Sequence, residues 1–290
     1  MSASTPQRLA AQNGLSACGR LTNEDPKPMD FLTVNGKKLE YAWLGPGPDD
    51  APTLVFLHEG LGCAAMWHDF PAALVERTGC GALVFSRAGY GGSDACELPR
   101  PVRFMHDEGL TVMPALFEAA GLRKAILIGH SDGGSIALIF AGGLQPSAVL
   151  GMITMAAHVH CEPLTRHAIE KIGHDFERGP LRSALERYHG PNTSCAFRGW
   201  KDVWLHPDFV HWNIEEYLPR IFVPLLAIQG DHDRYGTAGQ IASIKNKAGA
   251  GAEILLMKGC GHAPHKEFPD ATLGAMHRFI QKVLAKTVPA

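Results

Sequence analysis

Residues 124–135 form the stretch KAILIGHSDGGS, and the interpretation of the whole chain starts from it. The apolar run at 125–128 predicts a buried β-strand, and Ser131 follows it between Gly129 and Gly133. Glycines at such a point permit a tight turn from a strand into a helix. The turn could serve backbone packing alone, or it could present Ser131 as a nucleophile. The other loops of the chain distinguish these two interpretations.

Five other apolar runs predict further buried strands, and helical patterns separate most of them. Near-continuous apolar strands that alternate with helices are typical of a parallel sheet covered on both faces, so the predicted fold class is α/β. Asn35 and Gly36 predict a β-hairpin at 30–45, because both residues tolerate positive φ. The predicted strands lie within 52–60, 81–86, 125–130, 148–156, 223–230 and 253–259, and the predicted helices at 64–77, 106–120, 135–143, 238–248 and 270–286.

The alternation of strands and helices stops between residues 157 and 220. This segment has no clear buried strand and carries three of the five tryptophans. We expect a helical insertion here, flanked by the two parts of one core at 29–156 and 221–290. Residues 1–28 are polar and lack the basic-then-apolar order of a secretory signal, which predicts a flexible N-terminal tail.

The composition is that of a globular protein, with 46% hydrophobic and 19% charged residues in a chain of 290. A net charge of −2 gives no basic footprint for nucleic acid, and no apolar segment reaches the ~20 residues that span a membrane. Seven scattered cysteines without a C-x-x-C pair fit a reducing cytoplasm. His158 and His160 lack a third ligand at suitable spacing, so we predict neither a metal nor a cofactor.

Polar loops follow the predicted strands. The carboxyl ends of parallel strands meet at one edge of a sheet, where such proteins bind their ligands. We therefore expect these loops to form a single site for a small-molecule substrate. The loops are HEGLG at 58–62, SRAGYGGSD at 86–94, GHSDGG at 129–134, QGDHD at 229–233 and GCGHAPH at 259–265.

The sequence Gly-His-Ser-Asp-Gly at 129–133 matches the nucleophile elbow G-x-S-x-G. On this motif and the loops around it, the chain resembles the α/β-hydrolase fold family over roughly residues 30–286. The resemblance implies that Ser131 is the nucleophile. Dehalogenases and epoxide hydrolases of this fold use aspartate, which keeps Asp132 open as an alternative. The spacing of the two glycines, however, centres the motif on Ser131.

The same resemblance implies an acid after a later strand and a histidine after the next one. Asp233 and His262 occupy these places in the family's chain order. A serine hydroxyl is a weak nucleophile at neutral pH, so His262 would accept its proton while Asp233 orients the imidazole. Asp231 stays open as the alternative acid, and His265 stays open as the alternative base.

Backbone N–H groups near the serine are expected to stabilise an oxyanion. The resemblance implies the N–H of Asp132, which follows the nucleophile, as one donor. It implies a second donor in the loop after the first buried strand, from Gly60 or Leu61.

We assign four side chains of these loops to the substrate pocket: His58, Glu59, Arg87 and His130. By resemblance, His58 shapes the oxyanion loop. Glu59 departs from the family's usual glycine, and its carboxylate either contacts substrate or, as we favour, points to solvent. Arg87 is expected to anchor its loop by hydrogen bonds, with a direct substrate contact as the alternative.

In this family an insertion at 157–220 is commonly a helical cap, or lid, that closes the site from water. Trp200, Trp204 and Trp212 could line a pocket for an aromatic or apolar substrate. For each tryptophan taken singly, packing the cap onto the core is the favoured interpretation.

The resemblance implies a serine hydrolase that cleaves a small apolar or aromatic carboxylic ester through an acyl-enzyme. The same residues leave open a thioesterase and a carbon–carbon hydrolase of aromatic ring-fission products, for which Arg87 is the nearest carboxylate-binding candidate. A cofactor-free dioxygenase or lyase and a ligand-binding receptor also occur on this fold. The oligomeric state, including a homodimer, also stays open.

Overall fold

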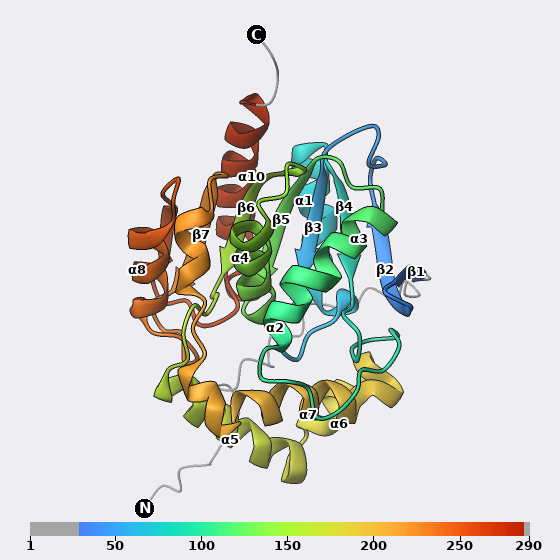
Figure 1. Cartoon of the computed structure of the whole chain (residues 1–290), viewed down its shortest axis with the longest axis vertical. Coiled ribbons are helices and arrows are strands. Elements are labelled where there is room, and N and C mark those ends of the chain that lie inside the picture. Colours follow the sequence, from blue (N-terminus) through green and yellow to red (C-terminus); the bar gives the residue numbers. More distant parts are fainter. Residues whose placement is uncertain (1–28, 287–290) are drawn as a thin grey trace, which may run out of the picture.

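An eight-stranded sheet forms the centre of the molecule, in the order β1-β2-β4-β3-β5-β6-β7-β8 (Figure 1). The structure, a computed structural model, describes residues 29–286, so the predicted tail at 1–28 lies outside the described residues. β1 and β2 form the predicted antiparallel hairpin, β2 pairs antiparallel with β4, and all other neighbours are parallel. The strands span Asp30–Val34, Lys37–Leu44, Thr53–Leu57, Gly81–Phe85, Ala125–His130, Val149–Met155, Leu225–Gly230 and Glu253–Met257, from β1 to β8. The predicted α/β class is confirmed.

Helices cover both faces of the sheet. β3, β4, β5 and β7 are buried along their whole length, which explains why their sequences are apolar without interruption. α1 and α10 pack on one face, whereas α2, α3, α4 and α8 pack on the other (Figure 1). The bounds are Phe70–Thr78 for α1, Phe104–Asp107 for α2, Met113–Ala119 for α3, Asp132–Leu144 for α4, Ala238–Lys247 for α8, Pro264–Glu267 for α9 and Pro269–Ala285 for α10.

Helical structure forms in both of the predicted ranges 64–77 and 106–120, each with an irregularity that the sequence did not indicate. The stretch 64–77 forms a short 3₁₀ helix, η2 (Ala64–Trp67), and then α1, because His68 adopts a φ of 50° between them. The stretch 106–120 contains a π-helical turn, η3 (Glu108–Val112), between α2 and α3. Gly109 in this turn packs closely on α4, where a Cβ atom would lie 2.8 Å from Ile139 Cγ2.

The turn between β5 and α4 is strained. Ser131 has a φ of 52°, in the left-handed region that few residues other than glycine adopt. Close backbone packing on both sides maintains it. A Cβ atom on Gly129 would lie 2.5 Å from the carbonyl oxygen of Gly133, and one on Gly133 would overlap the carbonyl of Leu57 at the end of β3. The glycines of the motif therefore allow α4 to start directly against two strands.

The segment between β6 and β7 contains helices and no named strand, as predicted. Its three longer helices lie together at one end of the molecule (Figure 1). An isolated bridge between His160 and Asn213 ties its two ends together. The helices are α5 (Pro163–Arg178), α6 (Leu181–His189), η4 (Gly190–Asn192), α7 (Thr193–Trp204), η5 (Pro207–His211) and η6 (Glu215–Arg220).

Gly133→Ala is expected to lower the free energy of unfolding by ~2–3 kcal/mol, because the added methyl group meets the backbone of β3. Gly274→Ala in α10 is the matched control, since its Cβ would meet no atom closer than 3.4 Å. That control should raise the free energy of unfolding by ~0.4–1 kcal/mol, through the lower entropy of the unfolded chain. Urea unfolding measures both, and a Gly133→Ala protein as stable as the wild type would contradict the close-packing argument.

Candidate active site

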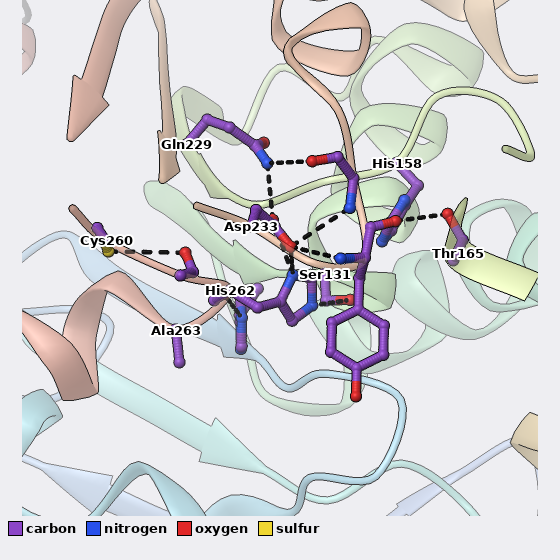
Figure 2. Close-up of polar contacts among 12 residues, drawn as sticks. Ser131, His158, Thr165, Gln229, Asp233, Cys260, His262 and Ala263 are labelled. Carbon is purple, nitrogen blue, oxygen red and sulfur yellow. Dashed lines mark hydrogen bonds and ion pairs between the residues drawn. The ribbon is translucent and has the colours of Figure 1, made fainter. Parts of the chain in front are cut away.

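Three side chains from three different strand ends form one line of hydrogen bonds. Ser131 follows β5, Asp233 follows β7 and His262 follows β8. His262 Nε2 lies 3.0 Å from Ser131 Oγ, and His262 Nδ1 lies 2.9 Å from each carboxylate oxygen of Asp233 (Figure 2). The structure thus brings together the three residues predicted as nucleophile, acid and base.

Three donors besides His262 form hydrogen bonds to the carboxylate of Asp233. Gln229 Nε2 donates to Oδ2 at 2.7 Å, and the backbone N–H groups of Tyr235 and Gly236 donate to Oδ1 at 2.8 and 3.3 Å (Figure 2). Burial alone would raise the pKa of Asp233, but the facing His262 and the hydrogen bonds lower it overall. This residue therefore stays ionised and fixed in orientation.

The alternative acid lies elsewhere. Asp231 Oδ1 accepts a hydrogen bond from the Gly259 N–H at 2.6 Å and so braces the loop after β7 against the loop after β8. The alternative base also faces away from the serine. The ring of His265 packs 4.8 Å from that of Trp67 and 5.6 Å from that of Phe70.

His262 is poised to accept a proton. Burial would lower its pKa, but the carboxylate of Asp233 raises it above the ordinary histidine value. The His130 ring donates from Nε2 to the His262 carbonyl oxygen at 2.7 Å, which fixes the loop that carries His262. His130 therefore contacts the backbone of this loop, a role that the sequence alone did not indicate.

The loop after β3, which we name the oxyanion loop because Gly60 or Leu61 was predicted as a donor, is held by two buried side chains. His58 donates from Nδ1 to the Glu59 carbonyl oxygen at 2.7 Å, and its Nε2 accepts the backbone N–H of Arg87 at 3.1 Å. The Arg87 guanidinium donates to the carbonyl oxygens of His58 and Glu59 at 2.8 and 3.1 Å. Arg87 is only 1% exposed, and these two hydrogen bonds anchor the oxyanion loop to it.

The carboxylate of Glu59 lies among charged neighbours. Its side chain is 19% exposed, and its oxygens lie 3.4 Å from Lys266 Nζ and 3.5 Å from His130 Nδ1. Burial opposes ionisation, but the positive charge of Lys266 and the contact with His130 hold the pKa of Glu59 well below its usual range. The expectation that this carboxylate points to solvent is wrong, because it joins the oxyanion loop to the elbow and to α9.

Two tryptophans of α7 contact two of the three residues predicted as possible oxyanion donors, Gly60 and Asp132. The indole nitrogen of Trp200 occupies the space where Gly60 would carry a Cβ atom. Trp204 Nε1 donates to Asp132 Oδ1 at 3.2 Å. Residues four apart share one face of a helix, so a single face of α7 covers the elbow and the oxyanion loop. Trp212 packs instead on Trp204 and Phe209, with ring centroids 5.8 and 5.3 Å apart.

The carboxyl group of Asp132 is buried beside the serine. Asp132 is fully buried, and its Oδ2 has no hydrogen-bond partner among the described residues. Burial raises its pKa to about 6, despite the positive charge of Arg87 and the hydrogen bond from Trp204. Since this carboxyl faces Trp204, and Ser131 faces His262, the geometry favours the serine as nucleophile.

Several contacts of the site were not predicted from the sequence. Gln229, His130 and Trp204 each hold a group that the reaction would use. A polar residue at the end of a buried strand was the one available signal for Gln229. Within residues 29–286, no group of three or more histidine, cysteine or acidic side chains could hold a metal ion. No helix in this part of the chain combines the length and apolarity needed to cross a membrane.

The family follows from a match over most of the chain. Residues 54–275 match the model of the alpha/beta hydrolase family. The chain belongs to this family. The matched region contains Ser131, Asp233 and His262, the three residues predicted as nucleophile, acid and base.

Individual relatives differ in what they cleave. An sn-1-specific diacylglycerol lipase of Danio rerio is 30% identical over 148 residues, which cover 48% of this chain and 45% of the lipase. A proline iminopeptidase of Lactobacillus helveticus is 27% identical over 80% of this chain and 91% of the peptidase. A bacterial membrane phospholipase A has a similar structure, with a TM-score of 0.69, 23% identity and coverage of 88% of this chain and 86% of its own. The chain thus spans less than half of the lipase but nearly all of the peptidase.

Asp132→Asn is expected to change how stability depends on pH. The folded-state pKa of about 6 exceeds the unfolded value of about 3.9, so ionisation destabilises the folded state. The wild type should lose stability relative to Asp132→Asn as pH rises from about 4 to about 6, by roughly 3 kcal/mol in total. Urea unfolding of both proteins across this range measures the difference, and parallel curves would contradict the raised pKa.

Proposed function

We propose that this protein cleaves a small apolar or aromatic carboxylic ester through an acyl-enzyme on Ser131. The observation that carries the proposal is the continuous line from the Asp233 carboxylate through His262 to Ser131 Oγ. The strained backbone of Ser131 supports it, because strain of this kind is kept where a side chain must be presented.

In the first half of the reaction, Ser131 Oγ attacks the ester carbonyl while His262 Nε2 accepts the hydroxyl proton. Asp233 stabilises the imidazolium that forms and keeps Nδ1 protonated. His262 then returns the proton to the leaving alcohol. In the second half, a water molecule replaces the alcohol, and the same histidine activates it to release the acid.

The negative charge on the carbonyl oxygen requires donors fixed in advance. We assign this role to the backbone N–H groups of Asp132 and of Gly60, with Leu61 as the alternative to Gly60. Asp132 begins α4, where the helix dipole also favours a negative charge. One such donor typically contributes ~3 kcal/mol to transition-state stabilisation.

We assign the helical segment at 157–220 to a cap over this site. Ser131 is 7% exposed, and Trp200 and Trp204 cover the loops beside it. The two buried indoles beside these loops support an apolar or aromatic substrate.

The carbon–carbon hydrolase alternative loses its main support. It needs a positive group for the substrate carboxylate, and Arg87 was the nearest candidate. Both terminal nitrogens of Arg87 instead donate hydrogen bonds to carbonyl oxygens of the oxyanion loop.

A cytoplasmic location of the protein is supported by its scattered thiols and stays a prediction.

Ser131→Ala is expected to lower kcat for short p-nitrophenyl esters by about 10⁴-fold, because the triad acts as a unit. Ser183→Ala, at an exposed position of α6, is the matched control and should retain full activity. Steady-state kinetics of the three proteins measure the effect. Equal rates for Ser131→Ala and the wild type would overturn the serine esterase. Oxygen uptake that survives the Ser131→Ala substitution would favour a dioxygenase. Tight binding of a ligand without its turnover would favour a receptor.

The pH dependence of kcat/KM is expected to report His262. The base must be neutral to accept a proton, so activity should fall as pH drops through the raised pKa of His262. Asp233→Asn should lower kcat by about 10⁴-fold and move this acidic limb to lower pH, since the carboxylate is what raises the pKa. An acidic limb that stays in place in Asp233→Asn would contradict this assignment.

A further inference from the structure

Two thiols meet where α7 contacts the core. Cys96 lies in the loop between β4 and α2, and Cys195 lies in the first turns of α7, 99 residues later. Their sulfur atoms are 3.0 Å apart, whereas a disulfide bond needs about 2.05 Å. Closing the pair therefore requires a movement of about 1 Å, within the range of a side-chain adjustment.

The core side of this pair is held in place. The loop that carries Cys96 is tied to β2 by two hydrogen bonds of 2.8 Å between Asp94 and Lys38. Arg100 donates to the Ala88 carbonyl oxygen at 2.6 Å and to Cys96 Sγ at 3.1 Å.

Gly89 has no side chain, which leaves space for the two sulfur atoms. A Cβ atom on Gly89 would lie 2.7 Å from Cys96 Sγ and 3.0 Å from Cys195 Sγ. The pair thus sits directly on the Cα of Gly89.

The α7 side of the pair is held by neighbouring residues. Asn192 Nδ2 donates to the carbonyl oxygens of Gly91 and Ser93 at 3.0 and 2.6 Å. His189 accepts the Gly91 N–H at 2.9 Å and donates to the Leu61 carbonyl oxygen at 3.0 Å. The two thiols are thus kept opposite one another by contacts on both sides.

We propose that Cys96 and Cys195 form a reversible disulfide site that locks α7 to the core, with a small-molecule disulfide such as oxidised glutathione as the oxidant. One thiol, as its thiolate, attacks a sulfur of the oxidant, and one small thiolate leaves. The second protein thiol attacks the protein-bound sulfur of this mixed disulfide, and the second small thiolate leaves. The pair loses two electrons and two protons, and the oxidant is reduced to two thiols.

The other thiols of the described chain are less suited to this chemistry. Cys63, Cys80 and Cys260 are buried, and burial raises the pKa of Cys63 and of Cys260 to about 12. Burial also raises the pKa of Cys96, although Arg100 opposes it, so what distinguishes this pair from the other thiols is the 3.0 Å between its sulfur atoms. Cys161 is half-buried and is a free cysteine without a cysteine partner among the described residues, which makes it a suitable control.

The consequence of the lock rests on the proposed function. α7 carries Cys195 near its start and the two tryptophans over Gly60 and Asp132 near its end. A disulfide at Cys195 would hold this helix in its closed position, so that a bulky substrate could not displace it. The oxidised protein is therefore expected to discriminate against large esters.

The site is tested by equilibrating the full chain with mixtures of oxidised and reduced glutathione. Free thiols are then blocked with N-ethylmaleimide, and the protein is digested without reductant for mass spectrometry. We expect one cross-link, between the peptides that hold Cys96 and Cys195, in the wild type and in Cys161→Ser. Cys195→Ser should show none. The site would be overturned if N-ethylmaleimide blocked both Cys96 and Cys195 at every redox ratio. A cross-link between other cysteines would also overturn it.

The lock is tested by comparing oxidised and reduced protein on a short and a bulky aromatic ester. Oxidation should lower kcat/KM for the bulky ester at least tenfold more than for the short one. Dithiothreitol should reverse the loss, and Cys195→Ser should lack it. A cross-link without any change in this ratio would overturn the restraint on α7. If neither redox form hydrolyses esters, the proposed function fails, whereas the peptide map still decides the disulfide site.

Discussion

The strained turn at Ser131 is the constraint on which the active site depends. A residue other than glycine holds a φ of 52° there only because α4 begins directly against β3 and β5. The same close approach places the first N–H groups of α4 beside the serine. It also determines where His262 must lie to reach Ser131 Oγ at 3.0 Å. One backbone contact thus helps to place Ser131 and the N–H of Asp132 relative to His262.

The strands could be predicted because their signals are local, whereas Ser131, Asp233 and His262 were predicted from a family motif and its chain order. Strands buried on both faces need uninterrupted apolar sequences, and the polar loops that follow them converge at one edge. The partners of Glu59 could not be predicted, since Lys266 is 207 residues away and only the fold brings it close. The contacts of Trp200 and Trp204 were equally hidden, because they depend on how the inserted helices dock. A helical pattern at 106–120 also gave no sign of the π-helical turn beside Gly109.

One set of polar contacts between the inserted helices and the core lies around the loops after β3, β4 and β5. His189, Asn192 and Cys195 contact the loops after β3 and β4, and Trp200 and Trp204 contact the oxyanion loop and the elbow. These contacts support the groups that are proposed to stabilise charge, whereas Gln229 contacts the proposed acid and His130 contacts the loop of the proposed base. His130 also lies 3.5 Å from Glu59 of the loop after β3, so the two sets of supporting residues meet at that carboxylate.

The position of the two tryptophans on one face of α7 limits how this enzyme can be altered. The helix that would form the wall of the substrate pocket also rests on Gly60 and on Asp132. Changes made there to admit a different substrate would also disturb the groups that stabilise the transition state. Under the proposed function, substrate range and turnover rate are therefore coupled, and directed evolution of this helix should meet trade-offs between them.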